Sequence, residues 1–349
     1  MSAVAYTPLP AAPIISPQQM EEFEEQGAIL VDLQLSPELL DAGEAAHDRD
    51  ASPMWADPDW VSLISSPVFE EIAKRVLRSE RVYVLETGRA SKGVDRTDAN
   101  ERAARDDWPA KHGHATEWAN AMHTDVQVTT EDFEATPRRE HLAIWFWVND
   151  VPPERAAMRV LTGSHKRLSA HWQEMQARWK AHPEQPLPVM HGPRWEAEGE
   201  PDARWFAGEE PTAMAAKRGY ALVFSQSLLH AGWSYSDPSG EPRKGFHISW
   251  VAEGVSIGGM RFNDNSGRID GVRERSRELR GLLAPERQHI AMSDETLERL
   301  VDLWEEEWPP TLRGRYCEKR NERLCRPLLL SLFIAVKSDR FTNAGSGQT

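Results

Sequence analysis

The stretch EHLAIWFWVNDV, residues 140–151, is a dense run of apolar and aromatic residues. Runs of this length that are rich in aromatic and β-branched residues are typical of strands. Similar short runs with turn residues beside them stand at 82–87 (VYVLET), 159–166 (RVLTGSHK), 217–236 (KRGYALVFSQSLLHAGWSYS) and 243–254 (RKGFHISWVAEG). Short strands separated by turns across residues 82–254 predict an antiparallel barrel or sandwich, and not alternating β-α-β units.

Side chains alternate between the two faces of the strand predicted at 140–151. Trp145 and Trp147 share one face, and Ile144 and Phe146 share the other. One of these faces has to belong to the core, while the other is able to line a pocket. The chain has 14 tryptophans, and two interpretations of them stay open: core packing, or the walls of an aromatic pocket.

Helix signals dominate both ends of the chain. In SPQQMEEFEEQG, residues 16–27, the Ser-Pro start and Gln19 predict a capping box, and Gly27 ends the helix. Further helix starts are expected at Ser36-Pro37 and Ser66-Pro67, a strand at 28–33 and a last helix at 294–308.

We therefore expect one domain over residues 1–349, mainly β with flanking α-helices. Its expected parts are an N-terminal helical part (1–81), a β core (82–255) with insertions at 88–120 and 169–216, and a C-terminal helical part (256–349). The insertion at 88–120 is long and highly charged, which is typical either of a lid over a site or of a disordered segment.

Composition limits the function classes. The 349 residues include 55 acidic and 41 basic side chains, a formal net charge of −14, which argues against nucleic-acid and anionic-membrane partners. Only Cys317 and Cys325 are cysteines, so a reducing cytoplasm fits the chain better than a disulfide framework. The first residues lack the basic region of a signal peptide, and the apolar run at 328–336 is too short to span a bilayer. We expect a cytoplasmic protein; its oligomeric state does not follow from the sequence.

A candidate metal site begins in AMHTDVQ, residues 121–127. In an extended strand, residues two apart point the same way, so His123 and Asp125 are able to bind one ion. An imidazole and a carboxylate supply two ligands of a facial triad. The pair is common by chance, so its interpretation depends on a third ligand.

That third ligand is expected at His230, in SLLHAGW, where an apolar strand ends. Arg243 opens the next strand, about a dozen residues later. A metal that grips a keto acid, together with an arginine that grips a far carboxylate, would hold a dicarboxylic keto acid at both ends.

Six segments resemble, in order, the phytanoyl-CoA dioxygenase family of iron(II)- and 2-oxoglutarate-dependent oxygenases. They are SPQQMEEFEEQGAILV, MHTDVQ, IWFWVNDV, MRVLTGSHK, GYALVFSQSLLHAG and PRKGFHISW, within residues 16–250. The resemblance implies a double-stranded β-helix (a jelly-roll or cupin-like barrel), with His123, Asp125 and His230 as iron ligands and Arg243 as the 2-oxoglutarate anchor.

The chain departs from the family's pattern at a few positions. Tyr220 replaces the usual aspartate after the turn glycine, and Asn149-Asp150 stands where an aspartate pair is usual. The segment between His230 and Arg243 is about two residues longer than usual, which leaves Lys244 as an alternative anchor.

Other site residues are expected around this set. Trp145 stands at the family's tryptophan position and is a candidate neighbour of the cosubstrate. His247 shares a strand face with Arg243, and it either contacts the cosubstrate or lines the wall. His165 is interpreted as a turn residue. Candidate substrate contacts are Gln127, Trp118, Trp147 and Trp233.

The expected cofactors are Fe(II), 2-oxoglutarate as cosubstrate, and O2. The expected reaction oxidises a small molecule, most simply by hydroxylation and in specialised metabolism, with release of succinate and CO2. Desaturation, epoxidation and cyclisation use the same chemistry and stay open as outcomes. Two other classes also stay open: a zinc-dependent hydrolase with the same ligands and a non-catalytic binder on the same fold.

Overall fold

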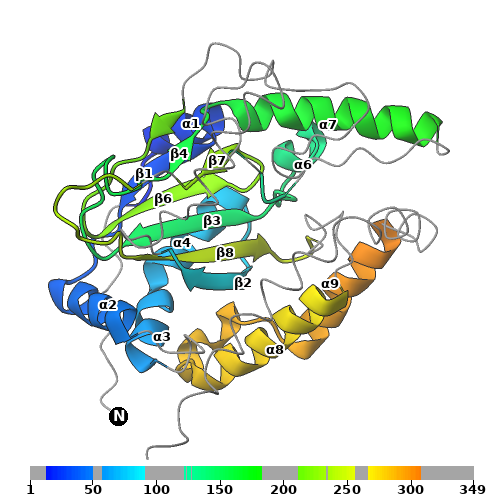
Figure 1. Cartoon of the computed structure of the whole chain (residues 1–349). Helices are drawn as coiled ribbons and strands as arrows, with labels where there is room; N and C mark the ends of the chain where they lie inside the picture. The colour runs from blue at the N-terminus through cyan, green and yellow to red at the C-terminus, as the bar shows by residue number, and fades with distance from the viewer. Residues whose placement is uncertain are drawn as a thin grey trace, which may run out of the picture.

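The computed structural model describes residues 13–49, 57–90, 122, 124–126, 128–182, 211–232, 235–255 and 266–307. Two antiparallel sheets form the centre of this part of the chain, and helices surround them (Figure 1). The strands are β1 (Ala28–Asp32), β2 (Val82–Arg89), β3 (Leu142–Trp147), β4 (Arg159–Val160), β5 (Thr212–Ala213), β6 (Tyr220–Ser225), β7 (His230–Ala231) and β8 (Gly245–Ala252). The helices are α1 (Pro17–Gln26), α2 (Pro37–Arg49), α3 (Pro58–Ile64), α4 (Pro67–Leu77), α6 (Thr130–Glu134), α7 (Ser164–Ala181), α8 (Ser266–Leu282), the 3-10 helix η5 (Pro285–Ile290) and α9 (Asp294–Glu307).

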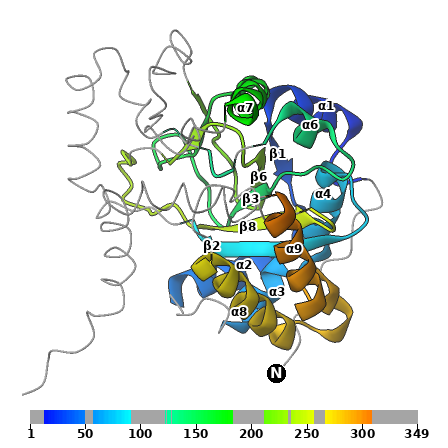
Figure 2. The same cartoon turned by 90° about the vertical axis from the view of Figure 1, so that its right-hand side faces the viewer.

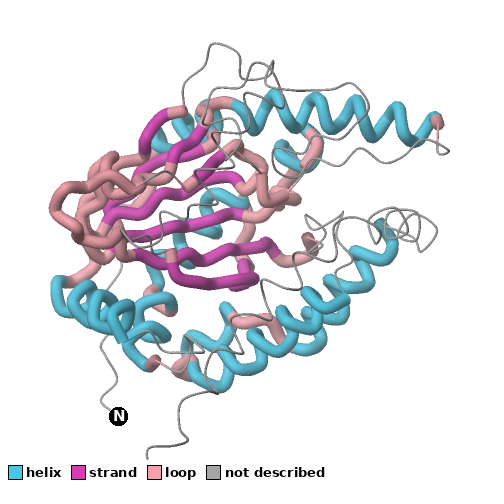
Figure 3. The backbone as a smooth tube through the Cα atoms, in the orientation of Figure 1, coloured by secondary structure: helices cyan, strands magenta, loops and turns pink. Residues whose placement is uncertain are grey.

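The larger sheet has five strands in the order β1-β6-β3-β8-β2. The aromatic strand β3 lies at its centre and pairs with β6 on one side and β8 on the other, so that Ile144 stands opposite both Val223 and Ile248. A central strand is buried on both faces, which explains why β3 is a nearly continuous apolar run. The strands lie side by side in Figure 3, with helices along the outside.

The smaller sheet has three strands in the order β5-β4-β7. Val160 of β4 pairs with Thr212 of β5 on one side and with His230 of β7 on the other. Two expectations need correction here. His230 does not end the strand β6 but opens the separate strand β7, because a turn at 226–228 comes between them. The insertion was expected to extend to residue 216, but its residues 212–213 form the strand β5 of this sheet.

The two faces of β3 belong to two different core clusters. Ile144 and Phe146 pack into the large cluster with the helices, whereas Trp145 and Trp147 face the second cluster, between the sheets. That second cluster combines residues of β3 and β6 with Val151, Ala157, Met158 and Val160 of the β4 side. The predicted alternation is confirmed, and so is the predicted double-stranded β-helix with flanking helices, although more of the described residues lie in helices than in strands.

The helices cover the outer face of the larger sheet. Helix α4 contacts β2, β3 and β8, while α8 contacts β2 and α3. Figure 2 shows α8 and α9 beside the β2 and β8 edge. The expected capping box of α1 is present: Ser16 and Gln19 exchange both hydrogen bonds, and Gly27 ends the helix at a φ of 80°. None of the helices in the described ranges is long and apolar enough to cross a bilayer.

Two further expectations were wrong in detail. His165 is not a turn residue but lies in the first turn of α7, fully buried against the ring of Phe133. Strand β2 continues through Gly88 and Arg89, which pair with His247 and Phe246, so the polar insertion begins two residues later than expected. The rest of the 88–120 insertion, from residue 91, and Cys317 and Cys325 lie outside the described residues.

Candidate active site

The structure brings two of the expected metal ligands together. The Nε2 atom of His230 lies 3.5 Å from Oδ2 of Asp125. The His230 side chain is buried, with 3% of its surface exposed, whereas 37% of the Asp125 side chain is exposed. Two atoms that bind one metal at about 2.1 Å on neighbouring octahedral positions lie about 3 Å apart. The observed separation therefore suits a shared ion.

A backbone contact fixes the orientation of the His230 ring. Its Nδ1 atom lies 2.9 Å from the carbonyl oxygen of Leu228, which only accepts hydrogen bonds. Nδ1 therefore carries the proton and donates it, and the Nε2 lone pair is directed towards Asp125. Ser164 holds the neighbouring residue by accepting a hydrogen bond from the Leu229 amide at 3.0 Å.

Asp125 is positioned differently from the expectation. It lies in a bend and not on a strand. The carbonyl oxygen of Gln226 accepts hydrogen bonds from the amides of both Asp125 and Val126, at 2.9 and 3.2 Å. Gln226 is itself held to β8, since its Nε2 atom donates to the Ser249 hydroxyl at 2.8 Å. The turn that precedes His230 thus also carries the backbone of Asp125.

Several expected site residues fall outside the described residues: His123, Gln127, Trp118 and Trp233. Within the described ranges, no three His, Cys, Asp or Glu side chains are close enough to hold one metal ion. The pair of Asp125 and His230 is therefore the part of the expected triad that the structure brings together.

A cavity of about 210 Å³ opens beside Asp125. It is lined by Leu85, Glu86, Asp125, Val126, His141, Trp145, Gln226, His247 and Ser249. Trp147 is not among these residues, because it is fully buried in the second core cluster.

Most of these lining residues are not predicted from the sequence. Glu86 is one example: the pairing of β2 with β8 shifts at Leu85, so that Glu86 stands opposite Ser249. A bulge of this kind re-aims side chains beside functional sites. The signal in the sequence is a carboxylate directly after the apolar run at 82–85, but the bulge itself does not follow from the residue pattern.

His247 lines the cavity and stacks on Trp145, with ring centroids 5.5 Å apart and an angle of 27°. The opposing position on β2 is Gly88, where any Cβ atom would overlap the imidazole. Burial lowers the pKa of His247. Its Nδ1 atom is buried and has no hydrogen-bond partner among the described residues. The prediction that His247 points into the barrel is confirmed.

Arg243 is a buried cation two residues before β8. Its Nε atom donates to the carbonyl oxygen of Ala90 at 3.0 Å, and its Nη1 atom donates to that of Ala156. The guanidinium carbon lies 5.8 Å from the ring centre of Trp145, which itself lines the cavity. Burial lowers the pKa of Arg243 to about 10, so the group stays charged at neutral pH.

No carboxylate in the described ranges pairs with Arg243. A buried charge without a counter-ion is unfavourable, and the site therefore suits an anionic ligand. Lys244 points elsewhere: its Nζ atom pairs with Glu44 and Asp48 of α2 at 3.0 and 2.7 Å. The geometry thus favours Arg243 over Lys244 as an anchor.

These donors suit a metal with a dicarboxylic keto acid. The His230 imidazole and the Asp125 carboxylate face each other, and His247 and the Arg243 guanidinium both lie against the Trp145 ring. A family model for phytanoyl-CoA dioxygenase (PhyH) matches residues 23–244, which is more than half of the chain. The chain belongs to the phytanoyl-CoA dioxygenase family.

Solved structures with similar folds were also found. The non-heme alpha ketoglutarate dependent carbocyclase SnoK from nogalamycin biosynthesis shares 17% identity over 68% of this chain and 84% of its own, with a TM-score of 0.46. EctD from S. alaskensis, with 2-oxoglutarate and 5-hydroxyectoine, shares 15% identity over 73% of this chain and 82% of its own, with a TM-score of 0.43. HygX from Streptomyces hygroscopicus, with nickel and 2-oxoglutarate, shares 10% identity over 68% of this chain and 86% of its own, with a TM-score of 0.43. No curated protein matches the chain.

Family membership establishes the reaction class. The protein is a non-haem iron enzyme that depends on 2-oxoglutarate and uses dioxygen, and it acts on a small-molecule substrate. The zinc hydrolase and the non-catalytic binder are therefore set aside.

Because Gly88 lies directly against the His247 ring, a substitution there tests whether the position of His247 matters for turnover. In Gly88→Ala the added methyl group must displace the His247 ring from Trp145. We expect 2-oxoglutarate turnover, measured as succinate release, to fall about 10- to 100-fold, because small displacements at a site have effects of that size. Gly281→Ala, where nothing lies within 4 Å of the new methyl group, is the matched control. Full turnover in Gly88→Ala would show that the position of His247 is immaterial.

Proposed function

We propose that this enzyme hydroxylates a C–H bond of a polar small molecule, using His123, Asp125 and His230 as iron ligands and Arg243 as the anchor of 2-oxoglutarate. In the balanced reaction, substrate, 2-oxoglutarate and O2 give an alcohol, succinate and CO2. The single observation that carries this proposal is the buried Arg243 guanidinium, which has no carboxylate partner among the described residues and adjoins the cavity wall at Trp145.

Each part of the site has a separate role in this proposal. Iron and 2-oxoglutarate, when bound, supply the activation of dioxygen. His230 would bind the metal through Nε2, because its Nδ1 proton is held by Leu228. Asp125 would add a charged ligand whose backbone Gln226 fixes. Arg243 would pair with the far carboxylate, and Trp145 with His247 would form the wall beside the keto acid.

The lining of the cavity supports a polar substrate. Six of its side chains carry polar groups: Glu86, Asp125, His141, Gln226, His247 and Ser249. Hydrogen-bonding groups of this kind fix the orientation of a ligand in a pocket. A product with one additional oxygen atom is either hydroxylated or epoxidised, and NMR of the product separates these two outcomes. Loss of two hydrogens identifies desaturation or cyclisation, and mass spectrometry detects it.

The ligand assignment predicts loss of metal binding. His123→Ala, Asp125→Ala and His230→Ala should each reduce Fe(II) affinity and succinate release by more than about 100-fold, since even changes behind metal ligands cost about 10- to 100-fold. Equilibrium dialysis of Fe(II) and a succinate assay measure the two effects. His289→Ala, a histidine that pairs with Glu70 away from the cavity, is the control. Near-native iron binding and turnover in His230→Ala would contradict the assignment.

The anchor assignment predicts a selective defect. Arg243→Ala should weaken 2-oxoglutarate binding by about 2–5 kcal/mol, which is at least about 30-fold, because it removes one partner of a buried charge pair. Arg243→Lys should recover part of the affinity, since lysine keeps the charge but lacks the planar fork. Lys244→Met, which removes only the ion pairs with α2, is the matched control. A defect in Lys244→Met with a silent Arg243→Ala would move the anchor to Lys244.

A further inference from the structure

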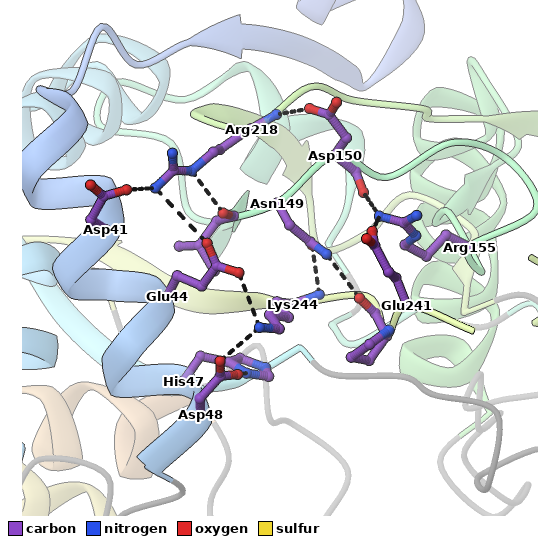
Figure 4. Close-up of polar contacts among 12 residues, drawn as sticks. Asp41, Glu44, His47, Asp48, Asn149, Asp150, Arg155, Arg218, Glu241 and Lys244 are labelled. Atoms are coloured by element: carbon purple, nitrogen blue, oxygen red, sulfur yellow. Dashed lines mark hydrogen bonds and ion pairs between the residues drawn. The ribbon is translucent and has the colours of Figure 1, made fainter. Parts of the chain in front are cut away.

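The end of strand β3 holds the backbone on both sides of Arg243. The side chain of Asn149 makes two hydrogen bonds: Nδ2 donates to the carbonyl oxygen of Pro242 at 2.9 Å, and Oδ1 accepts from the amide of Lys244 at 2.9 Å. One amide group therefore bridges the residues that directly precede and follow Arg243. Figure 4 shows Asn149 between Lys244 and the segment that contains Glu241.

Other contacts also hold this segment, independently of the hydrogen bonds that the Arg243 side chain makes. The amide of Val148 donates to the carbonyl oxygen of Lys244 at 3.1 Å, so both polar groups of the Lys244 backbone are bound to the end of β3. Pro242 has no amide hydrogen and a fixed φ. The Lys244 side chain is held outside by α2, which directs its neighbour Arg243 inward. The Asn149 bridge is the contact that joins the two flanks of Arg243.

We infer that Asn149 is a positioning residue for the 2-oxoglutarate anchor, acting through the backbone at Pro242 and Lys244. The inference rests on the proposed role of Arg243. A guanidinium recognises a carboxylate through a rigid fork, so its affinity depends on where its backbone is held. Only a side chain with one donor and one acceptor makes this bridge, and the Asn149 amide has both.

The inference predicts a graded effect on cosubstrate binding. Asn149→Ala removes both bonds and should weaken 2-oxoglutarate binding about tenfold, as changes behind a ligand-binding residue do. Asn149→Asp keeps the acceptor for Lys244 and loses the donor to Pro242, and it should weaken binding about threefold. Asp150→Ala, the neighbouring truncation, removes a contact with the Arg218 amide and should leave the affinity unchanged. Calorimetry on anaerobic Fe(II) enzyme measures all three.

The chemistry of the ligand separates positioning from general destabilisation. 2-Oxobutyrate has the keto acid end but lacks the far carboxylate that Arg243 would bind. Its affinity should therefore be the same in the wild type and in Asn149→Ala. Equal weakening of both keto acids would overturn the inference, because it would show that Asn149 acts on the whole site.

A second readout needs neither metal nor cosubstrate. Without the Asn149 acceptor, the Lys244 amide should exchange its hydrogen faster in Asn149→Ala, whereas Asn149→Asp should keep the wild-type rate. Hydrogen exchange of the peptide around residues 243–246 tests this in the ligand-free full chain. Unchanged exchange in Asn149→Ala would contradict the bridge.

Combination with Arg243→Ala distinguishes failure of the inference from failure of the proposed function. In the Arg243→Ala background, Asn149→Ala should alter 2-oxoglutarate affinity by less than about twofold, because the two residues act as one unit. A full tenfold effect in that background would overturn the positioning role. If Arg243→Ala alone leaves 2-oxoglutarate binding intact, the proposed anchor itself is wrong.

Discussion

The site depends on one electrostatic constraint, the buried charge of Arg243. Burial lowers its pKa only to about 10, so the guanidinium enters the protein interior as a cation. Two carbonyl oxygens and two tryptophan rings surround it, and none of these carries a full negative charge. Ala156, which presents one of these carbonyls, has a φ of 56°, a conformation that non-glycine residues rarely adopt. A local backbone cost is thus accepted at the residue that holds Arg243, as is common at functional sites.

The rest of the fold holds the candidate ligands and the cavity wall in place. The large core cluster fixes the outer face of the five-stranded sheet, so β3 and β8 present Trp145 and His247 to the cavity on a rigid support. The turn between β6 and β7 adds the other half of the site, because Gln226 carries the backbone of Asp125 and Leu228 fixes the ring of His230. The proposed metal ligand His230 therefore belongs to the smaller sheet, the turn before it holds Asp125, and the proposed anchor Arg243 lies two residues before β8 of the larger sheet.

The parts of the fold and of the site that local sequence determines were predictable. The period-two alternation of β3 placed Trp145 opposite to Ile144, and the Ser16 capping box fixed the start of α1. Tertiary contacts decided the remainder. Strands β4, β5 and β7 have two residues each, too few to show a period. The backbone of Asp125 is held by the carbonyl of Gln226, about 100 residues away in the sequence, and the position of Glu86 is set by a bulge in β2. Neither feature leaves a signal in the local sequence. The His-x-Asp motif predicted the reaction class, whereas most residues of the cavity wall were identified only from the structure.

Visible absorption of the anaerobic Fe(II) enzyme on addition of 2-oxoglutarate tests whether the metal and Arg243 hold one cosubstrate molecule. A keto acid that chelates ferrous iron produces a metal-to-ligand charge-transfer band, whereas a carboxylate that binds elsewhere does not. We predict that the band appears with saturating 2-oxoglutarate, in a one-to-one ratio with the protein, and that succinate produces none. If 2-oxoglutarate binds the Fe(II) enzyme by calorimetry and no band appears, the metal and Arg243 do not share one ligand, and the site described around them is wrong.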